Sequence, residues 1–344
     1  MSIEAVGPAG AVAPVAGEGA ERAAGATSPS ARSRAKRLAG VAGTVACVLS
    51  LVFIGRELAR HGPELASWRP GSGEIAAIAA LACLHALAMF LLAETWHRIV
   101  GAFGHEPRGR TWTAYAVTQI ARYLPGNVAH LFGRAAWLRG GALGAGALTK
   151  ATLVELAVVP LGALAALAPI LALLPPSALA ALLPWPLPDA IAEAAPPLLA
   201  CGALAATFAG AVLAGTLLPG AGRGANDLVR GAARLAAPIG FVALFMLWLG
   251  GSFALLVLAL TQVPLGLALI ACILAWLVGY ATPGAPGGIG VREAVMVVGL
   301  QTAMGPAAAA AGPLVLAVVL HRVVTTLGDA VCFAMGLGLR RLSR

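Results

Sequence analysis

Seven ionisable side chains lie within or directly beside the long apolar runs of this 344-residue chain. They are Arg122, Arg134, Glu155, Arg292, Glu293, Arg322 and Asp329. A charge of this kind costs about 2.5–3.5 kcal/mol at the centre of a membrane helix on insertion scales. If all seven faced lipid unpaired, the summed cost would exceed a typical protein's stability, about 5–15 kcal/mol. We therefore expect them to converge inside the protein, either as ion pairs between helices or as the lining of a polar chamber for a charged headgroup.

Two of the segments that carry these charges are broken by proline and glycine: RYLPGNVAHLFGR at 122–134 and PGAPGGIGVRE at 283–293. Backbone that leaves regular helix inside a membrane exposes N–H and C=O groups, so such segments must face protein or water. Paired interruptions in the two halves of a membrane protein indicate a substrate site at a repeat interface. Glycine and proline also allow close packing in ordinary membrane helices, so both interpretations stay open here.

Two features favour the chamber over ion pairing alone. Among the intramembrane charges, four arginines stand against three acids. A helix that begins near Val291 would also point its positive N-terminal end at the glycine-rich break, an arrangement that binds anions. Arginine presents a planar fork that suits phosphate. Glu155 needs a cationic partner from another segment, and Arg322 and Asp329, seven residues apart, share a helix face.

The residue patterns of metal sites, ATP-driven pumps and nucleic-acid binding are absent from the sequence. The five cysteines form no C-x-x-C pair, and the three aspartates stand far apart, so we expect no metal site and no cofactor. No phosphate-cradling GxxxxGK[ST] motif occurs, which argues against an ATP-driven pump. No basic, aromatic-rich soluble face is present to bind nucleic acid. The histidines have no ligand-like spacing and are interpreted as packing or interfacial residues: His85, His97, His130 and His321.

The elements that must position these residues are membrane helices. Hydrophobic residues make up 60% of the chain and charged residues 11%, against roughly 45–50% and about 25% in soluble domains. We predict an all-α, polytopic transmembrane helical bundle with about seven or eight spans and two Gly/Pro-broken or re-entrant segments. Residues 1–37 are predicted to be a disordered tail with a basic flank, 38–340 the transmembrane domain, and 341–344 a basic tail. The predicted spans are 38–58, 75–96, 151–174, 198–218, 238–260, 264–281 and 307–339.

The charge distribution predicts the orientation of these spans. The net charge of +9 gathers at span ends, and the N-terminal flank holds four basic residues. By the positive-inside rule the N-terminus is cytoplasmic, as are the loops around 98–110 and 223–234 and the terminal RRLSR. Seven crossings that start inside would finish outside, so one irregular segment must supply an eighth. Gly288 to Met304 is the best candidate. We expect a multi-pass protein of the cell (plasma or inner) membrane.

The broken stretches resemble a known membrane family. RYLPG at 122–126, GR at 133–134, Glu155, PGGIGVREA at 286–294 and HR at 321–322 are similar to the transmembrane region of lysylphosphatidylglycerol synthase, the flippase domain of the multiple peptide resistance factor. The resemblance covers about residues 38–340. It implies an integral membrane lipid translocase, or a relative whose lipid is a polyprenyl or dolichyl carrier.

The resemblance also implies which residues line the central cavity. They are Arg122, Tyr123, Pro125, Gly126, Arg134, Glu155, Pro286, Gly287, Gly288, Arg292 and Glu293, to which we add the neighbouring Asn127 and Arg322. Full-length synthases continue into a soluble aminoacyl-transferring domain, whereas this sequence stops at Arg344. We therefore expect a transporter rather than an enzyme that makes aminoacyl lipid.

Three hypotheses follow from the sequence. The first is a flippase-like translocase that moves an anionic, phosphate-bearing or aminoacylated lipid headgroup through the chamber. The second is a membrane transferase that acts on a polyprenyl-phosphate lipid. The third is a non-transporting membrane partner of a lipid synthase or glycosyltransferase. The expected partners are thus a membrane phospholipid or polyprenyl-linked lipid, together with such an enzyme under the third hypothesis.

Overall fold

The computed structural model describes scattered positions between 48 and 67 and then residues 68–124, 129–181, 188–222, 224–282, 285–305 and 311–342. Within these ranges all regular structure is helical and no strand occurs, so the all-α prediction is confirmed. The helices are α3 (Ser72–Gly101), α4 (Arg108–Gln119), η1 (Ile120–Tyr123), α5 (Ala129–Leu138), α6 (Ala145–Ala172), α7 (Pro176–Ala181), α8 (Asp189–Gly215), α9 (Ala225–Leu260), α10 (Leu265–Ala281), η2 (Pro286–Gly288), α11 (Val291–Met304) and α12 (Ala311–Leu342).

Among the described residues, five helices are long and apolar enough to cross a membrane, which makes the chain a multi-pass membrane protein. The shortest of the five apolar segments has 23 residues, and at about 1.5 Å per residue it exceeds the roughly 30 Å of a bilayer's hydrocarbon core. These segments are Ser72–Gly101, Ala145–Ala172, Glu193–Gly215, Ala225–Leu260 and Gly312–Arg341. Each coincides with one predicted span, whereas the predicted span at 38–58 lies almost wholly outside the described residues.

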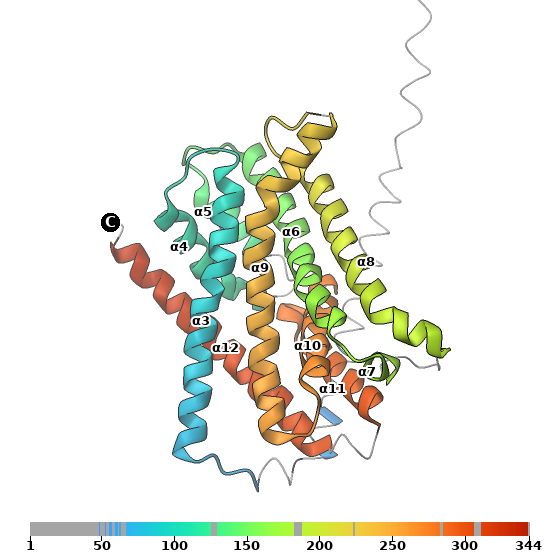
Figure 1. Ribbon diagram of the computed structural model, residues 1–344. Helices are drawn as coiled ribbons and strands as arrows, with labels where there is room; N and C mark the ends of the chain where they lie inside the picture. Colours follow the sequence, from blue (N-terminus) through green and yellow to red (C-terminus); the bar gives the residue numbers. More distant parts are fainter. Residues whose placement is uncertain are drawn as a thin grey trace, which may run out of the picture.

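Along the chain, successive long helices run in opposite directions (Figure 1). In Figure 1, α3, α6, α8 and α9 run roughly side by side, and α12 crosses them obliquely. Thr95 late in α3 donates to the Pro238 carbonyl at 3.3 Å, whereas His85 earlier in α3 lies against Phe245 further along α9, so these two helices are antiparallel. Small residues allow close approach: a β-carbon on Gly215 of α8 would lie 2.7 Å from the carbonyl carbon of Gly231 in α9.

Helices α10 and α11 form a hairpin that returns to one end of the bundle. They have 17 and 14 residues, about 25 and 21 Å, and neither alone spans a hydrocarbon core of about 30 Å. Leu265 at the start of α10 and Met304 at the end of α11 line the same pocket. The tip between them lies beside the middle of other spans, because the Tyr280 hydroxyl donates to the Leu156 carbonyl of α6 at 3.2 Å.

This hairpin occupies the predicted crossings at 264–281 and Gly288 to Met304, and neither of its helices is among the five long enough to cross a membrane. Gly287, Gly288 and Gly290 have φ values of 59°, 71° and 81°, a left-handed backbone that glycine adopts without strain and that reverses the chain. Hydropathy records the length of an apolar run but not its depth, so it cannot separate a helix that crosses from one that turns back. We infer that α10 and α11 re-enter, which keeps the C-terminus on the side that the terminal arginines predict.

A second hairpin, formed by α4, η1 and α5, enters from the opposite end. The Ala142 N–H donates to Glu106 Oε1 at 2.8 Å, so the chain just before α4 lies beside the chain just after α5. This hairpin follows the end of α3, whereas the other follows the end of the antiparallel α9. Their tips meet: a β-carbon on Gly287 would lie 3.0 Å from Cδ1 of Tyr123.

Basic residues gather at the end of the bundle where α3 and α12 finish. Arg340 of α12 lies over the Trp137 ring of α5 at 5.1 Å, and Arg110 of α4 donates to the Leu138 carbonyl at 3.4 Å. The positive-inside rule assigns this end to the cytoplasm. By the same rule we expect the α4–α5 hairpin, named the cytoplasmic hairpin here, to enter from the cytoplasmic side and the α10–α11 hairpin, named the outer hairpin, to enter from the other side.

Labelling of single cysteines tests the re-entrant hairpin. In a chain whose native cysteines are replaced, Gln262→Cys before α10 and Met304→Cys at the end of α11 should both react with a membrane-impermeant maleimide from the outer side. His105→Cys, in the exposed loop before α4, should react only from the cytoplasmic side. Reaction of Gln262→Cys and Met304→Cys from opposite sides would show that α10 and α11 together cross the membrane.

Candidate functional site

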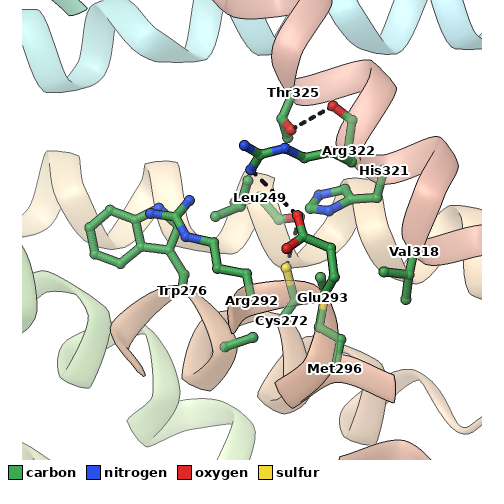
Figure 2. A pocket seen from close by; sticks show the side chains of 11 residues that line it. Leu249, Cys272, Trp276, Arg292, Glu293, Met296, Val318, His321, Arg322 and Thr325 are labelled. Atoms are coloured by element: carbon green, nitrogen blue, oxygen red, sulfur yellow. Dashed lines mark hydrogen bonds and ion pairs between the residues drawn. The ribbon is translucent and has the colours of Figure 1, made fainter. Parts of the chain in front are cut away.

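Two small polar cavities adjoin where the hairpin tips meet, and both are lined by Trp276 and Arg292. The larger, of about 50 Å³, is also lined by Tyr115, Gln119, Arg122, His130, Arg134, Glu155 and Tyr280. The smaller, of about 20 Å³, is also lined by Cys272, Glu293, His321, Arg322 and Thr325 (Figure 2). A water molecule needs about 10–15 Å³ of such space, so in this conformation the cavities hold one to a few waters.

The first ion pair joins Arg134 of α5 to Glu155 of α6. Their side chains are only 2% and 5% exposed, and Arg134 Nη1 contacts Glu155 Oε1. Gln119 of α4 accepts a second hydrogen bond from Arg134 at 3.3 Å, and the guanidinium lies 4.0 Å from the centre of the Tyr115 ring. The prediction that Glu155 finds a cation on another segment is confirmed.

The second ion pair joins the cytoplasmic hairpin to the last helix. Arg122 Nη2 of η1 contacts Asp329 Oδ2 of α12, and the Tyr123 hydroxyl donates to the same oxygen at 2.5 Å. The Asp329 side chain is 1% exposed, and His85 Nε2 of α3 lies 3.9 Å from its other oxygen. Asp329 thus ties the tip of the hairpin to α3 and α12.

The third ion pair joins the outer hairpin to the last helix. Arg322 Nη1 of α12 lies 3.5 Å from Glu293 Oε1 of α11, as Figure 2 shows. The Arg322 guanidinium also lies 5.6 Å from the centre of the Tyr123 ring. Through Arg322 and Asp329, α12 contacts both hairpin tips.

Arg292 differs from the other three arginines. Among the described residues, no carboxylate lies within ion-pair distance of it, and its Nε has no hydrogen-bond partner. Its guanidinium instead lies over the Trp276 ring at 5.1 Å, as Figure 2 shows. Two glycines form the slot for the side chain: a β-carbon on Gly279 would lie 2.6 Å from Arg292 Cγ, and one on Gly288 would lie 2.5 Å from Nε.

Further buried side-chain atoms near the cavities lack hydrogen-bond partners among the described residues. They include Glu155 Oε2, Glu293 Oε2 and Asp329 Oδ1, together with Nε of Arg122 and Arg134 and Nη2 of Arg322. An unsatisfied buried polar group costs about 1–3 kcal/mol. A cluster of such groups at mid-membrane is typical of a site that binds water or a polar ligand rather than of packing between helices.

The structure brings together most of the predicted site residues. Arg122, Arg134, Glu155 and Arg292 surround the larger cavity, and Glu293 and Arg322 join Arg292 at the smaller one. Tyr123, Pro286, Gly287 and Gly288 form the facing hairpin tips. Pro125, Gly126 and Asn127 lie outside the described residues. The ion-pair interpretation of the sequence is therefore confirmed for three of the arginines, whereas Arg292 has no carboxylate partner among the described residues.

Sequence reasoning missed several residues of the site. The sequence indicates Asp329 as an intramembrane charge but does not identify it as the partner of Arg122, a cavity residue. Two histidines interpreted as packing or interfacial residues, His130 and His321, line the cavities. Trp276 and Tyr115, which lie against arginines, carried no signal at all, because an aromatic residue in a membrane helix is as common in packing as in a site.

The described part of the chain contains no group of three or more His, Cys, Asp or Glu side chains that could hold a metal ion. No family model matches the sequence, and a comparison with curated proteins found no matching relative.

Proposed function

We propose that the protein is a lipid translocase of the flippase type that binds the phosphate of an anionic lipid headgroup at the meeting point of its two hairpins. The observation that carries this proposal is Arg292, an arginine at mid-membrane that has no carboxylate partner among the described residues. The proposal agrees with what the resemblance to the lysylphosphatidylglycerol synthase membrane region implies.

The charge of the site supports an anionic ligand. Three carboxylates pair with three arginines, which leaves the cluster with one net positive charge on Arg292. Arg292 also lies in the first turn of α11, where the positive end of the helix favours anions. A guanidinium that stacks on an aromatic ring keeps its in-plane N–H groups free for a bidentate bond to phosphate.

The size of the cavities supports movement of the hairpins during transport. About 50 Å³ admits waters but not a lipid headgroup, so the tips must separate before a headgroup passes. The contacts of the tips with α12 are of a kind that can exchange. Arg322 of α12 lies by the Tyr123 ring, and a phosphate could replace Asp329 as the anionic partner of Arg122, or Glu293 as that of Arg322.

Substitution of Arg292 tests the proposal. In vesicles of phosphatidylcholine with a trace of fluorescent phosphatidylglycerol, Arg292→Ala should abolish protein-dependent lipid movement between leaflets, because the uncompensated cation is lost. Arg292→Lys should retain part of it, since lysine keeps the charge but not the fork. The matched control, Arg341→Ala, removes an exposed arginine at the end of α12 and should leave movement unchanged.

The outcome that would contradict the proposal is full lipid movement by Arg292→Ala that is as well folded as the wild type. Because the assay uses purified protein alone, it also separates a translocase from a scaffold for another enzyme. Neither the scaffold nor the transferase hypothesis gains an observation of its own from the residues that the structure describes.

A further inference from the structure

An apolar groove of about 440 Å³ runs between α5 and α6. Leucine, alanine and phenylalanine side chains form most of its wall, with two threonines and Arg139. The groove is open at the side, because Phe132 is 70% exposed and Leu153 is 47% exposed. Its volume falls within the roughly 300–1,000 Å³ of typical ligand sites, and in a membrane such an opening faces hydrocarbon.

The groove adjoins the larger polar cavity. Leu131 lines both. On α6, Glu155 lines the cavity and the next residue, Leu156, lines the groove. The carbonyl of Leu156 in turn accepts the hydrogen bond from Tyr280, a cavity residue. An apolar groove beside a cavity lined by three arginines matches a molecule with one apolar and one anionic end.

Arginines lie at both ends of the route that leads from the groove to the cavity. Arg139 lines the groove just after the end of α5, at the cytoplasmic surface of the bundle, where basic side chains attract anionic headgroups. Arg134, one and a half turns earlier in the chain, lies at the inner end and lines the cavity. A headgroup that moves inward from Arg139 therefore meets Arg134 and then Arg292.

We propose that the groove between α5 and α6 binds an acyl chain of an anionic phospholipid taken from the cytoplasmic leaflet while its headgroup passes along these arginines. The proposal rests on the proposed function for the path of the headgroup. The acyl-chain site itself is a binding site, and it is tested by binding as well as by transport.

Photolabelling tests the binding site. The full chain is reconstituted in phosphatidylcholine vesicles with trace phosphatidylglycerol that carries a diazirine in one acyl chain. Labelled positions should concentrate on the groove walls of α5 and α6, and excess unlabelled phosphatidylglycerol should suppress this labelling at least tenfold. Extra phosphatidylcholine or inorganic phosphate should not suppress it. Equal labelling of lipid-facing α8 residues such as Phe208, 60% exposed, without competition, would show ordinary surrounding lipid and overturn the proposal.

A substitution that fills the groove with a bulky side chain tests whether the groove is needed for transport. Ala136→Trp places a large ring where an exposed alanine lines the groove, and it should reduce both specific labelling and lipid movement at least tenfold. The matched control is Ala206→Trp on the exposed face of α8, which should leave both unchanged. Unaltered labelling and movement in folded Ala136→Trp would overturn the proposal, as would preferential labelling by a polyprenyl-phosphate probe.

The two proposals fail in different ways. Specific labelling of the groove by a wild-type protein that moves no lipid would contradict the translocase and leave the acyl-chain site standing. Lipid movement that depends on Arg292 but not on the groove, with uniform labelling, would contradict the acyl-chain site and leave the translocase standing.

Discussion

Replacement of Glu155 with leucine should lower the free energy of unfolding by about 3–5 kcal/mol, because it leaves a buried arginine without its carboxylate. Arg134 is only 2% exposed at its side chain and has no other acidic partner within the described residues. The remaining contacts, with Gln119 and the Tyr115 ring, hydrogen-bond or stack with the guanidinium but do not neutralise it. Thermal unfolding in detergent, compared with wild type, measures the loss.

A double variant separates charge from packing in this prediction. Arg134→Leu combined with Glu155→Leu removes both charges, and such replacements are often neutral or stabilising, so stability should largely return. The control pair is Asp227 and Arg230, 3.8 Å apart and exposed; Arg230→Leu should change stability by at most about 1 kcal/mol. A double variant as unstable as Glu155→Leu would contradict the assignment of the loss to an unpaired charge.

Replacement of Gly287, at the tip of the α10–α11 hairpin, is the second change for which we expect a large effect. Gly287→Ala should destabilise the protein, because a left-handed backbone costs an L-residue about 1–2 kcal/mol and the residue has φ 59°. The new methyl group would also lie 3.0 Å from the Tyr123 ring of the other hairpin, which pushes the tips apart. Lipid movement should therefore fall further than the loss of folded protein explains.

The matched control for this change is Gly299→Ala in the middle of α11. A β-carbon there meets nothing within 4 Å, and alanine is favoured over glycine in a helix by roughly 1 kcal/mol. The two substitutions should thus shift the unfolding temperature in opposite directions. A shift of the same sign for both would remove the special role of the Gly287 backbone.

The long helices could be predicted from the sequence because their signal is local. An apolar run such as 75–96 specifies a membrane helix by length and composition alone, and the structure extends it to Ser72–Gly101. The re-entrant hairpins could be predicted only as interruptions. Whether α10 crosses or turns back depends on where its tip packs, and the contacts that decide this, such as Tyr280 with Leu156, come from another helix.

The same limit applies to the candidate site. An arginine in an apolar run predicts that a partner exists, since the cost of an unpaired charge is high, but nothing local identifies it. The partner of Arg122, Asp329, lies 207 residues away in the sequence, whereas the partner of Arg134, Glu155, lies only 21 residues away. The excess of one arginine could be counted from the sequence, but only the packing shows that Arg292 is the one without a carboxylate.

The long separation of Arg122 and Asp329 has a consequence for biosynthesis. A ribosome adds about 5–20 residues per second, so the 207 residues between them take about 10–40 s to make. During that interval Asp329 is not yet available to pair with Arg122, and burial of an arginine without its carboxylate is costly. Helix α12 therefore completes the site, and we expect a nascent chain that ends before α12 to leave the α4–α5 hairpin at the membrane surface.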